Sequence, residues 1–384
     1  MVYLKPRYRF VYLSGFLVSL YYAMTVYINS SFLEKFFTKT QIDHLYITGA
    51  CITIFCFILS SRFVNKFGNY HLVLLGIALQ MTALLTMAFS QDPLWIIVAF
   101  ISYQALAPLI IFGLDIFFEG ALVTIRDAEK VRSFYLTFMN LAFVLAPLSV
   151  GFLVAQGAFT TIYVAAALVI GTLWFLIYDL FYGLRPRRFR EIGFIDSLQK
   201  FVKRKSLTPI FFMDLVLQCF YALMVIFTGP YLHEVIGLPW SSIGIIFTIM
   251  LLPFIIFEAP LGKLFDRLHD ERDVLIAGFL IMAISTLMIA FVRSQSIVVW
   301  AAILFMSRVG ASFVEVAAEA SFFRRVTDQD AGFISIFRLA VPLAYVITPF
   351  GATFAIAALP VSALYIFLSI TLLLGLGIAY KYSF

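Results

Sequence analysis

Hydrophobic residues fill long stretches of this 384-residue chain, and short polar segments separate them. Each stretch has about the 20 residues with which a helix crosses a hydrocarbon core of roughly 30 Å. Membrane-crossing strands are only about 10 residues long, and a backbone in lipid must satisfy its own hydrogen bonds, so helices are predicted. The pattern predicts twelve transmembrane helices, at residues 9–29, 43–60, 71–90, 94–119, 133–155, 159–182, 207–229, 240–260, 274–292, 297–320, 332–352 and 359–380.

The composition places the chain among integral membrane proteins. Hydrophobic residues make up 63% of it, 44 residues are Phe, and the mean hydropathy is +1.01. A soluble protein of this length could not bury so much apolar surface. The basic first residues lead into an apolar run that is too long for the core of a signal peptide, so we expect the first span to be retained. The predicted fold class is an all-α polytopic membrane protein.

The positions of cysteine and histidine argue against an enzyme. Cys51, Cys56 and Cys219 lie inside apolar runs without the spacing of a metal site, and the four histidines lie at the ends of runs or between them. The sequence contains no nucleotide-binding or nucleophile motif. We therefore expect no enzymatic activity, no metal and no cofactor.

The basic residues predict the orientation, because cytoplasmic loops carry an excess of Lys and Arg. With the N-terminus inside, only Lys35, Lys39 and Arg293 of the 27 Lys and Arg fall in outside loops, while Arg308 and Arg338 fall within spans. Both termini are therefore predicted to be cytoplasmic. The net charge of +6 reflects this topology, and no nucleic-acid partner is expected.

The longest inside loop divides the spans into six and six. We predict a first bundle over residues 1–183, a basic linker over 184–206 and a second bundle over 207–384. The linker is either a partly amphipathic helix at the anionic inner surface or a solvated connection. Acids recur at an offset of about 200 residues, since Asp115 and Glu119 correspond to Glu315 and Glu319. Such a tandem repeat predicts two bundles that face each other across a central cavity and alternate its access.

A short charged stretch between the eighth and ninth spans adds a family resemblance. Residues 262–267 read Gly-Lys-Leu-Phe-Asp-Arg, which resembles the signature loop of the major facilitator superfamily, although His269 and Asp270 depart from the pattern that follows. The first-half copy keeps Arg62, Lys66 and a glycine but has Asn65 in place of the acid. The resemblance implies a secondary transporter with the fold of this superfamily, and it says little about the substrate.

In this superfamily an acid at the cytoplasmic end of the fourth helix of each half commonly joins the loop charges in a cluster. The resemblance therefore implies a cytoplasmic gate, with Glu258 beside it, made of Gly262, Asp266, Arg267, Glu319, Glu119, Arg62 and Lys66.

The tenth span carries a polar stripe. Arg308, Ser312, Glu315 and Glu319 follow one another at spacings that place all of them on one helical face. An ionisable side chain inside a span is costly unless it is paired or hydrated, so each is a candidate functional group. Either Arg308 offers its charge to an anionic group and Glu315 carries a coupling proton, or the charges are locks between helices. The fourth span repeats the lower part of the stripe with Gln104, Pro108, Asp115 and Glu119 on a shared face.

The seventh span places Asp214, Gln218 and Tyr221 on one face, and Arg338 enters the eleventh span at a similar depth. These positions predict an Asp214–Arg338 or a Glu315–Arg338 pair. Tyr22 in the first span, with its neighbouring tyrosines, either lines the cavity or packs against lipid and other helices.

Together these features predict a secondary transporter of a small solute, powered by a gradient because no ATP-binding sequence is present. We expect it to be monomeric, coupled to protons, and located in a bacterial cytoplasmic membrane. Arg308 favours an anionic substrate, and the many Phe and Tyr keep an amphipathic solute open. The alternatives are a lipid or lysolipid flippase on the same fold, and a receptor or assembly protein that transports nothing.

Overall fold

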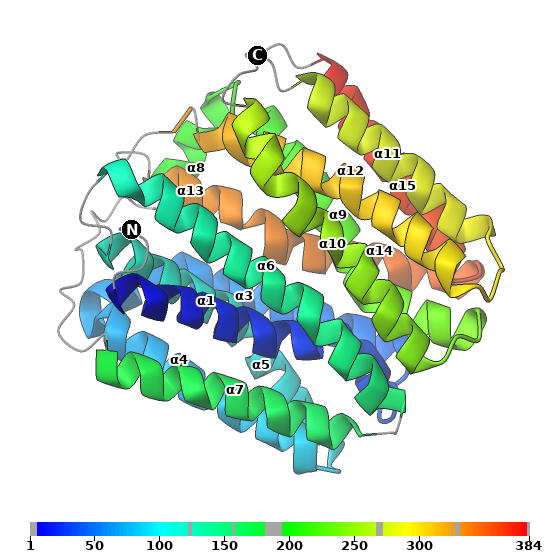
Figure 1. Cartoon of the computed structure of the whole chain (residues 1–384), viewed down its shortest axis with the longest axis horizontal. Helices are drawn as coiled ribbons and strands as arrows, with labels where there is room; N and C mark the ends of the chain where they lie inside the picture. The colour runs from blue at the N-terminus through cyan, green and yellow to red at the C-terminus, as the bar shows by residue number, and fades with distance from the viewer. Residues whose placement is uncertain are drawn as a thin grey trace. The chain divides into compact units, whose positions relative to one another are not determined.

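The computed structural model describes residues 6–121, 125–155, 158–180, 194–265, 272–323, 325–326 and 331–381. Every regular element in this part of the chain is a helix (Figure 1). Twelve of the helices are long and apolar enough to cross a membrane, which confirms the predicted number of spans. The contacts divide the chain into two compact units, residues 1–191 and 192–384, called here the first and second unit.

The first unit contains six of these long helices and one short helix. They are α1 (Pro6–Val26), α2 (Asn29–Leu33), α3 (Lys39–Phe67), α4 (Asn69–Phe89), α5 (Pro93–Ala121), α6 (Ile125–Ala155) and α7 (Phe159–Leu180). The second unit contains α8 (Phe194–Lys203), α9 (Thr208–Pro230), a π-helical turn η2 (Tyr231–Val235), α10 (Trp240–Phe265), α11 (Arg272–Phe291), α12 (Ile297–Phe323), α13 (Ala331–Arg338), α14 (Ala340–Ala358) and α15 (Ala363–Lys381).

The two units have the same pattern of helix packing. In the first unit α1 packs on α5, α6 and α7, while α4 packs on α5 and α7, and α3 packs on α5 (Figure 1). In the second unit α9 packs on α12, α14 and α15, while α11 packs on α12 and α15, and α10 packs on α12. Each of these pairings in one unit has its counterpart in the other, in the chain order that a tandem repeat requires.

Local sequence explains where several helices begin and end. Thr38 caps α3, because its hydroxyl accepts from the Gln41 N–H while the Gln41 side chain accepts from the Thr38 N–H, at 3.4 and 2.9 Å. Gly68 separates α3 from α4 with a φ of 80°, a conformation that side chains with a Cβ rarely adopt.

The eleventh predicted span is broken where a continuous helix was expected. α13 ends at Arg338, Leu339 forms a turn, and α14 begins at Ala340. Pro342 has no N–H to donate to the Arg338 carbonyl, so the helical ladder cannot continue through this point. The break places Arg338 at the end of a helix.

Part of the predicted linker is helical. α8 buries the Phe201 ring against Phe211 and Phe333, at centroid distances of 5.9 and 5.6 Å. Its Lys200 and Lys203 side chains are exposed. The described part of the linker is therefore an amphipathic helix attached to α9 and α13 of the second unit.

Candidate transport site

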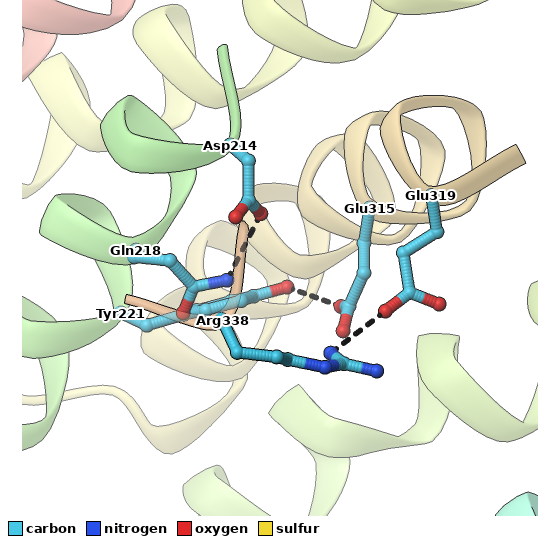
Figure 2. Close-up of polar contacts among 6 residues, drawn as sticks. All are labelled: Asp214, Gln218, Tyr221, Glu315, Glu319 and Arg338. Atoms are coloured by element: carbon cyan, nitrogen blue, oxygen red, sulfur yellow. Dashed lines mark hydrogen bonds and ion pairs between the residues drawn. The ribbon is translucent and has the colours of Figure 1, made fainter. Parts of the chain in front are cut away.

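The polar face of α9 begins with a buried carboxylate. The Asp214 side chain is 6% exposed, and its Oδ1 accepts a hydrogen bond of 3.1 Å from Gln218 Nε2 one turn later (Figure 2). The spacing of these residues predicted a shared face, and the structure joins them. Asp214 is thus held by a neutral amide of its own helix.

Tyr221, one turn further along α9, connects this helix to α12. Its hydroxyl donates a hydrogen bond of 2.6 Å to Glu315 Oε2 (Figure 2). A phenol is neutral, so this bond supports the carboxylate without neutralising it. No ion pair of Glu315 occurs among the described residues.

Arg338 makes a different ion pair from those predicted. Its Nη1 lies 3.0 Å from Glu319 Oε1, where the sequence suggested Asp214 or Glu315 as its partner (Figure 2). Arg338 is the last residue of α13, and its side chain reaches Glu319 near the C-terminal end of α12. The two side chains are 42% and 35% exposed, so this pair contributes only about 0–1 kcal/mol to stability.

Arg308 is the cation of the stripe on α12. Its side chain is 1% exposed, and its guanidinium lies over the rings of Phe220 and Tyr221 on α9, at 4.8 and 5.3 Å from their centroids. Its Nε and Nη1 have no hydrogen-bond partner in the part of the chain that the structure describes. The Ser312 hydroxyl on the same face donates to the Val309 carbonyl at 2.9 Å and makes no hydrogen bond with Arg308.

In the first unit, the Gln104 side chain on α5 is hydrogen-bonded to the backbone of α3. Its Nε2 donates to the Tyr46 carbonyl at 3.3 Å, and its own backbone carbonyl accepts from Thr53. Both bonds attach α5 to α3. Tyr22 is half-buried and stacks on Tyr103, with ring centroids 6.4 Å apart, so it packs against a neighbouring helix.

The first unit also contains a buried cluster of polar groups that the sequence reasoning missed. Hydrogen bonds join Thr25 to Tyr103 at 2.7 Å, Ser30 to Tyr46 at 3.1 Å and Tyr163 to Asn29 at 2.8 Å. Tyr21, Thr25 and Asn29 recur every four residues, so their shared face was a signal in the sequence. Asp43, which is 2% exposed on α3, was also missed because it lay at the boundary of a predicted span.

Much of the predicted gate lies outside the described residues. This holds for Asp266 and Arg267, and for the side chains of Glu119 on α5 and Glu258 on α10; Gly262 belongs to α10 by its backbone. The side chain of Asp115 on α5, a candidate for substrate or proton binding, lies outside the described residues as well. Arg62 and Lys66 are exposed near the end of α3.

Twelve helices that could cross a membrane, with charged side chains within them, are typical of membrane transporters. Comparison with known families matches residues 215–383 to the Major Facilitator Superfamily. A crystal structure of a point mutant of the nucleoside transporter NupG has a TM-score of 0.79 and 10% identity, covering 97% of this chain and 99% of that one. A second NupG structure has a TM-score of 0.77 and 11% identity, covering 99% of this chain and 100% of that one. No curated protein matches the sequence.

The family pattern matches the second half of the chain, and the likeness of fold to the two transporter structures extends over nearly its whole length. The family match agrees with the resemblance that the loop at residues 262–267 suggested.

Proposed function

We propose that the protein is a proton-coupled transporter of a small solute, working as a monomer by alternating access in a cytoplasmic membrane. Glu315 is the proton carrier in this proposal, and Glu319 with Arg338 belongs to the cytoplasmic gate. The fold supports the transport part of the proposal, and the second unit supplies the chemistry.

The bond between Tyr221 and Glu315 carries the proposal. Glu315 is in a membrane-spanning helix, and its partner is a neutral hydroxyl at 2.6 Å. A carboxylate locked to an arginine stays charged, whereas one held by a phenol can gain and lose a proton while keeping a hydrogen bond. A coupling group must do both during each transport cycle.

The state of the stripe on α12 favours a transporter over a receptor or assembly protein. A purely structural stripe would have its charges closed into ion pairs. Among the described residues, Glu319 is paired with Arg338, but neither Arg308 nor Glu315 is in an ion pair. Costly unpaired groups of this kind usually mark a substrate or proton path.

The test measures proton movement in proteoliposomes that contain a pH-sensitive dye. A panel of small solutes is added, including nucleosides because the similar structures belong to a nucleoside transporter. We expect at least one solute to drive proton movement with the wild type. Glu315→Gln keeps the shape and the bond from Tyr221, so it should abolish that movement while solute exchange continues.

The control is Asp273→Asn, which removes an exposed acid at the start of α11, away from the cluster. This variant should move protons like the wild type. Unchanged proton movement in Glu315→Gln would refute its role as carrier. Transport of a solute by the wild type without any proton would refute coupling itself, and flipping of a labelled lysolipid with no solute transport would favour the flippase.

A further inference from the structure

The starting point is a buried positive charge without a counter-charge. Arg308 is 1% exposed, and its Nε and Nη1 have no hydrogen-bond partner among the described residues. A buried charge left unpaired costs several kcal/mol, and unsatisfied N–H groups add to this cost. Arg308 therefore destabilises the folded protein unless another group pairs with it.

The aromatic rings beside Arg308 offset only part of the cost. Phe220 and Tyr221 present their faces to the guanidinium at 4.8 and 5.3 Å, and such cation–π contacts stabilise a buried cation in part. A ring face attracts the charge but does not replace the acceptor that an N–H group needs. The hydroxyl of the preceding residue, Ser307, donates to the Leu304 carbonyl and makes no hydrogen bond with Arg308.

The nearby acids are engaged elsewhere. Glu315 accepts from Tyr221, Glu319 pairs with Arg338, and Asp214 accepts from Gln218 (Figure 2). Glu315 also lies two helical turns from Arg308 along α12, a rise of about 10 Å. Each described acid of the cluster thus has another partner, and Arg308 is left for a group that the protein does not provide.

We propose that Arg308 binds a negatively charged oxygen group of the transported solute, so that the substrate is an organic anion. This inference rests on the proposed function as a transporter. A guanidinium matches a carboxylate or a phosphate ester better than any other side chain does. The rings of Phe220 and Tyr221 provide apolar contact for the organic part. Tyr221 connects this site to Glu315, because its ring lies against Arg308 and its hydroxyl donates to Glu315. A monovalent anion and a proton that enter together add no net charge.

The experiment compares matched pairs of small molecules on the full-length protein in detergent, at one pH and without a gradient. The pairs are benzoate with benzamide, nicotinate with nicotinamide, lactate with lactamide, and phenyl phosphate with phenol. Thermal unfolding is measured with each, because a ligand that binds the folded state raises Tm. We expect at least one anion to raise Tm and its neutral partner to have no effect. Whether the carboxylates or the phosphate ester raise Tm then shows which kind of anionic group Arg308 binds.

Variants of Arg308 give the decisive comparison. Arg308→Gln should weaken binding of that anion by at least about 30-fold, since it removes one partner of a buried charged contact. Arg308→Lys keeps the charge but loses the fork, so it should bind more weakly while still preferring the anion. Arg293→Gln removes an arginine near the outer end of α11 and should bind like the wild type. The Tm of each variant without ligand reports whether it is folded.

Three results would overturn the proposal: no anion of the panel raises the wild-type Tm, the neutral partners raise it equally, or Arg308→Gln binds the anion as tightly as the wild type. If Arg308→Gln does not fold, binding of the anion by folded Arg308→Lys as tightly as by the wild type overturns the proposal instead. These binding results do not depend on whether transport is coupled to protons. Proton coupling is refuted separately, if the anion is transported across the membrane of proteoliposomes without movement of a proton.

Discussion

Tyr221 serves two groups at once, because its ring lies against Arg308 and its hydroxyl donates to Glu315. Tyr221→Phe keeps the ring and removes only the hydroxyl. We expect anion binding in detergent to stay near the wild-type level, while proton movement in proteoliposomes falls roughly tenfold, since a hydrogen bond to a charged group contributes about 1.5–3 kcal/mol.

The matched control for this prediction is Tyr365→Phe in α15. Tyr365 is fully buried, and its hydroxyl bonds to Thr228 rather than to an acid. It should lose stability without losing coupling. Equal loss of proton movement in both variants would mean that Tyr221 acts through packing alone.

The sequence predicted which residues would lie on the polar faces, but it did not predict how they pair. The spacing within α12 placed Arg308, Glu315 and Glu319 together, because the helical period is the same in every helix. The partners of these residues come from α9 and α13, and a spacing along one helix contains no information on how another helix is rotated or where it ends. Arg338 therefore binds Glu319, and the Tyr221–Glu315 bond was not foreseen.

At the scale of helices, α11 and α12 approach each other through glycine. A Cβ at Gly310 would lie 2.6 Å from the Gly278 carbonyl oxygen and 2.8 Å from the Met282 nitrogen, both backbone atoms that cannot turn aside. In lipid, such close contact replaces the hydrophobic effect as the force that joins helices. Gly310→Ala should therefore destabilise the protein by about 1–3 kcal/mol, measured as a lower Tm in detergent.

Gly351→Ala in α14 is the control for this prediction, because a Cβ there meets nothing within 4 Å. It should leave Tm unchanged or raise it slightly, since alanine favours a helix by about 1 kcal/mol over glycine. A Tm for Gly310→Ala equal to that of the wild type would show that the two helices can separate without cost.

The helices themselves were largely predictable, since their lengths and hydropathy are properties of the sequence alone. All twelve predicted spans correspond to helices, although α6 begins at Ile125, well before the predicted start at 133. The last helix, α15, begins at Ala363 and not at the predicted residue 359, because Pro360 disfavours a helical conformation of the residue before it. The π-helical turn after Pro230 had no equivalent signal, since it depends on how the chain leaves α9.

For the whole molecule, the two units share one pattern of helix packing, but different polar groups connect their helices. In the second unit the described polar contacts between α9, α12 and α13 involve carboxylates and arginines. In the first unit the equivalent helices α1 and α5, with α3, are joined by hydroxyl and amide groups, at Thr25–Tyr103 and Gln104–Tyr46. We therefore expect the second unit to determine charge recognition and coupling, and the first to contribute neutral polar contacts.

The orientation of the whole chain gives the final prediction. The basic residues place the α4–α5 and α11–α12 connections outside and the α8 helix inside, because positively charged loops remain in the cytoplasm. Single cysteines are introduced at exposed positions, as Gln91→Cys, Ser296→Cys and Gln199→Cys, after the three native cysteines are replaced. A membrane-impermeant maleimide should label the first two in intact cells and the third only after permeabilisation. The opposite pattern would invert the topology, and it would place the Glu319–Arg338 pair and the proposed gate on the outer side of the membrane.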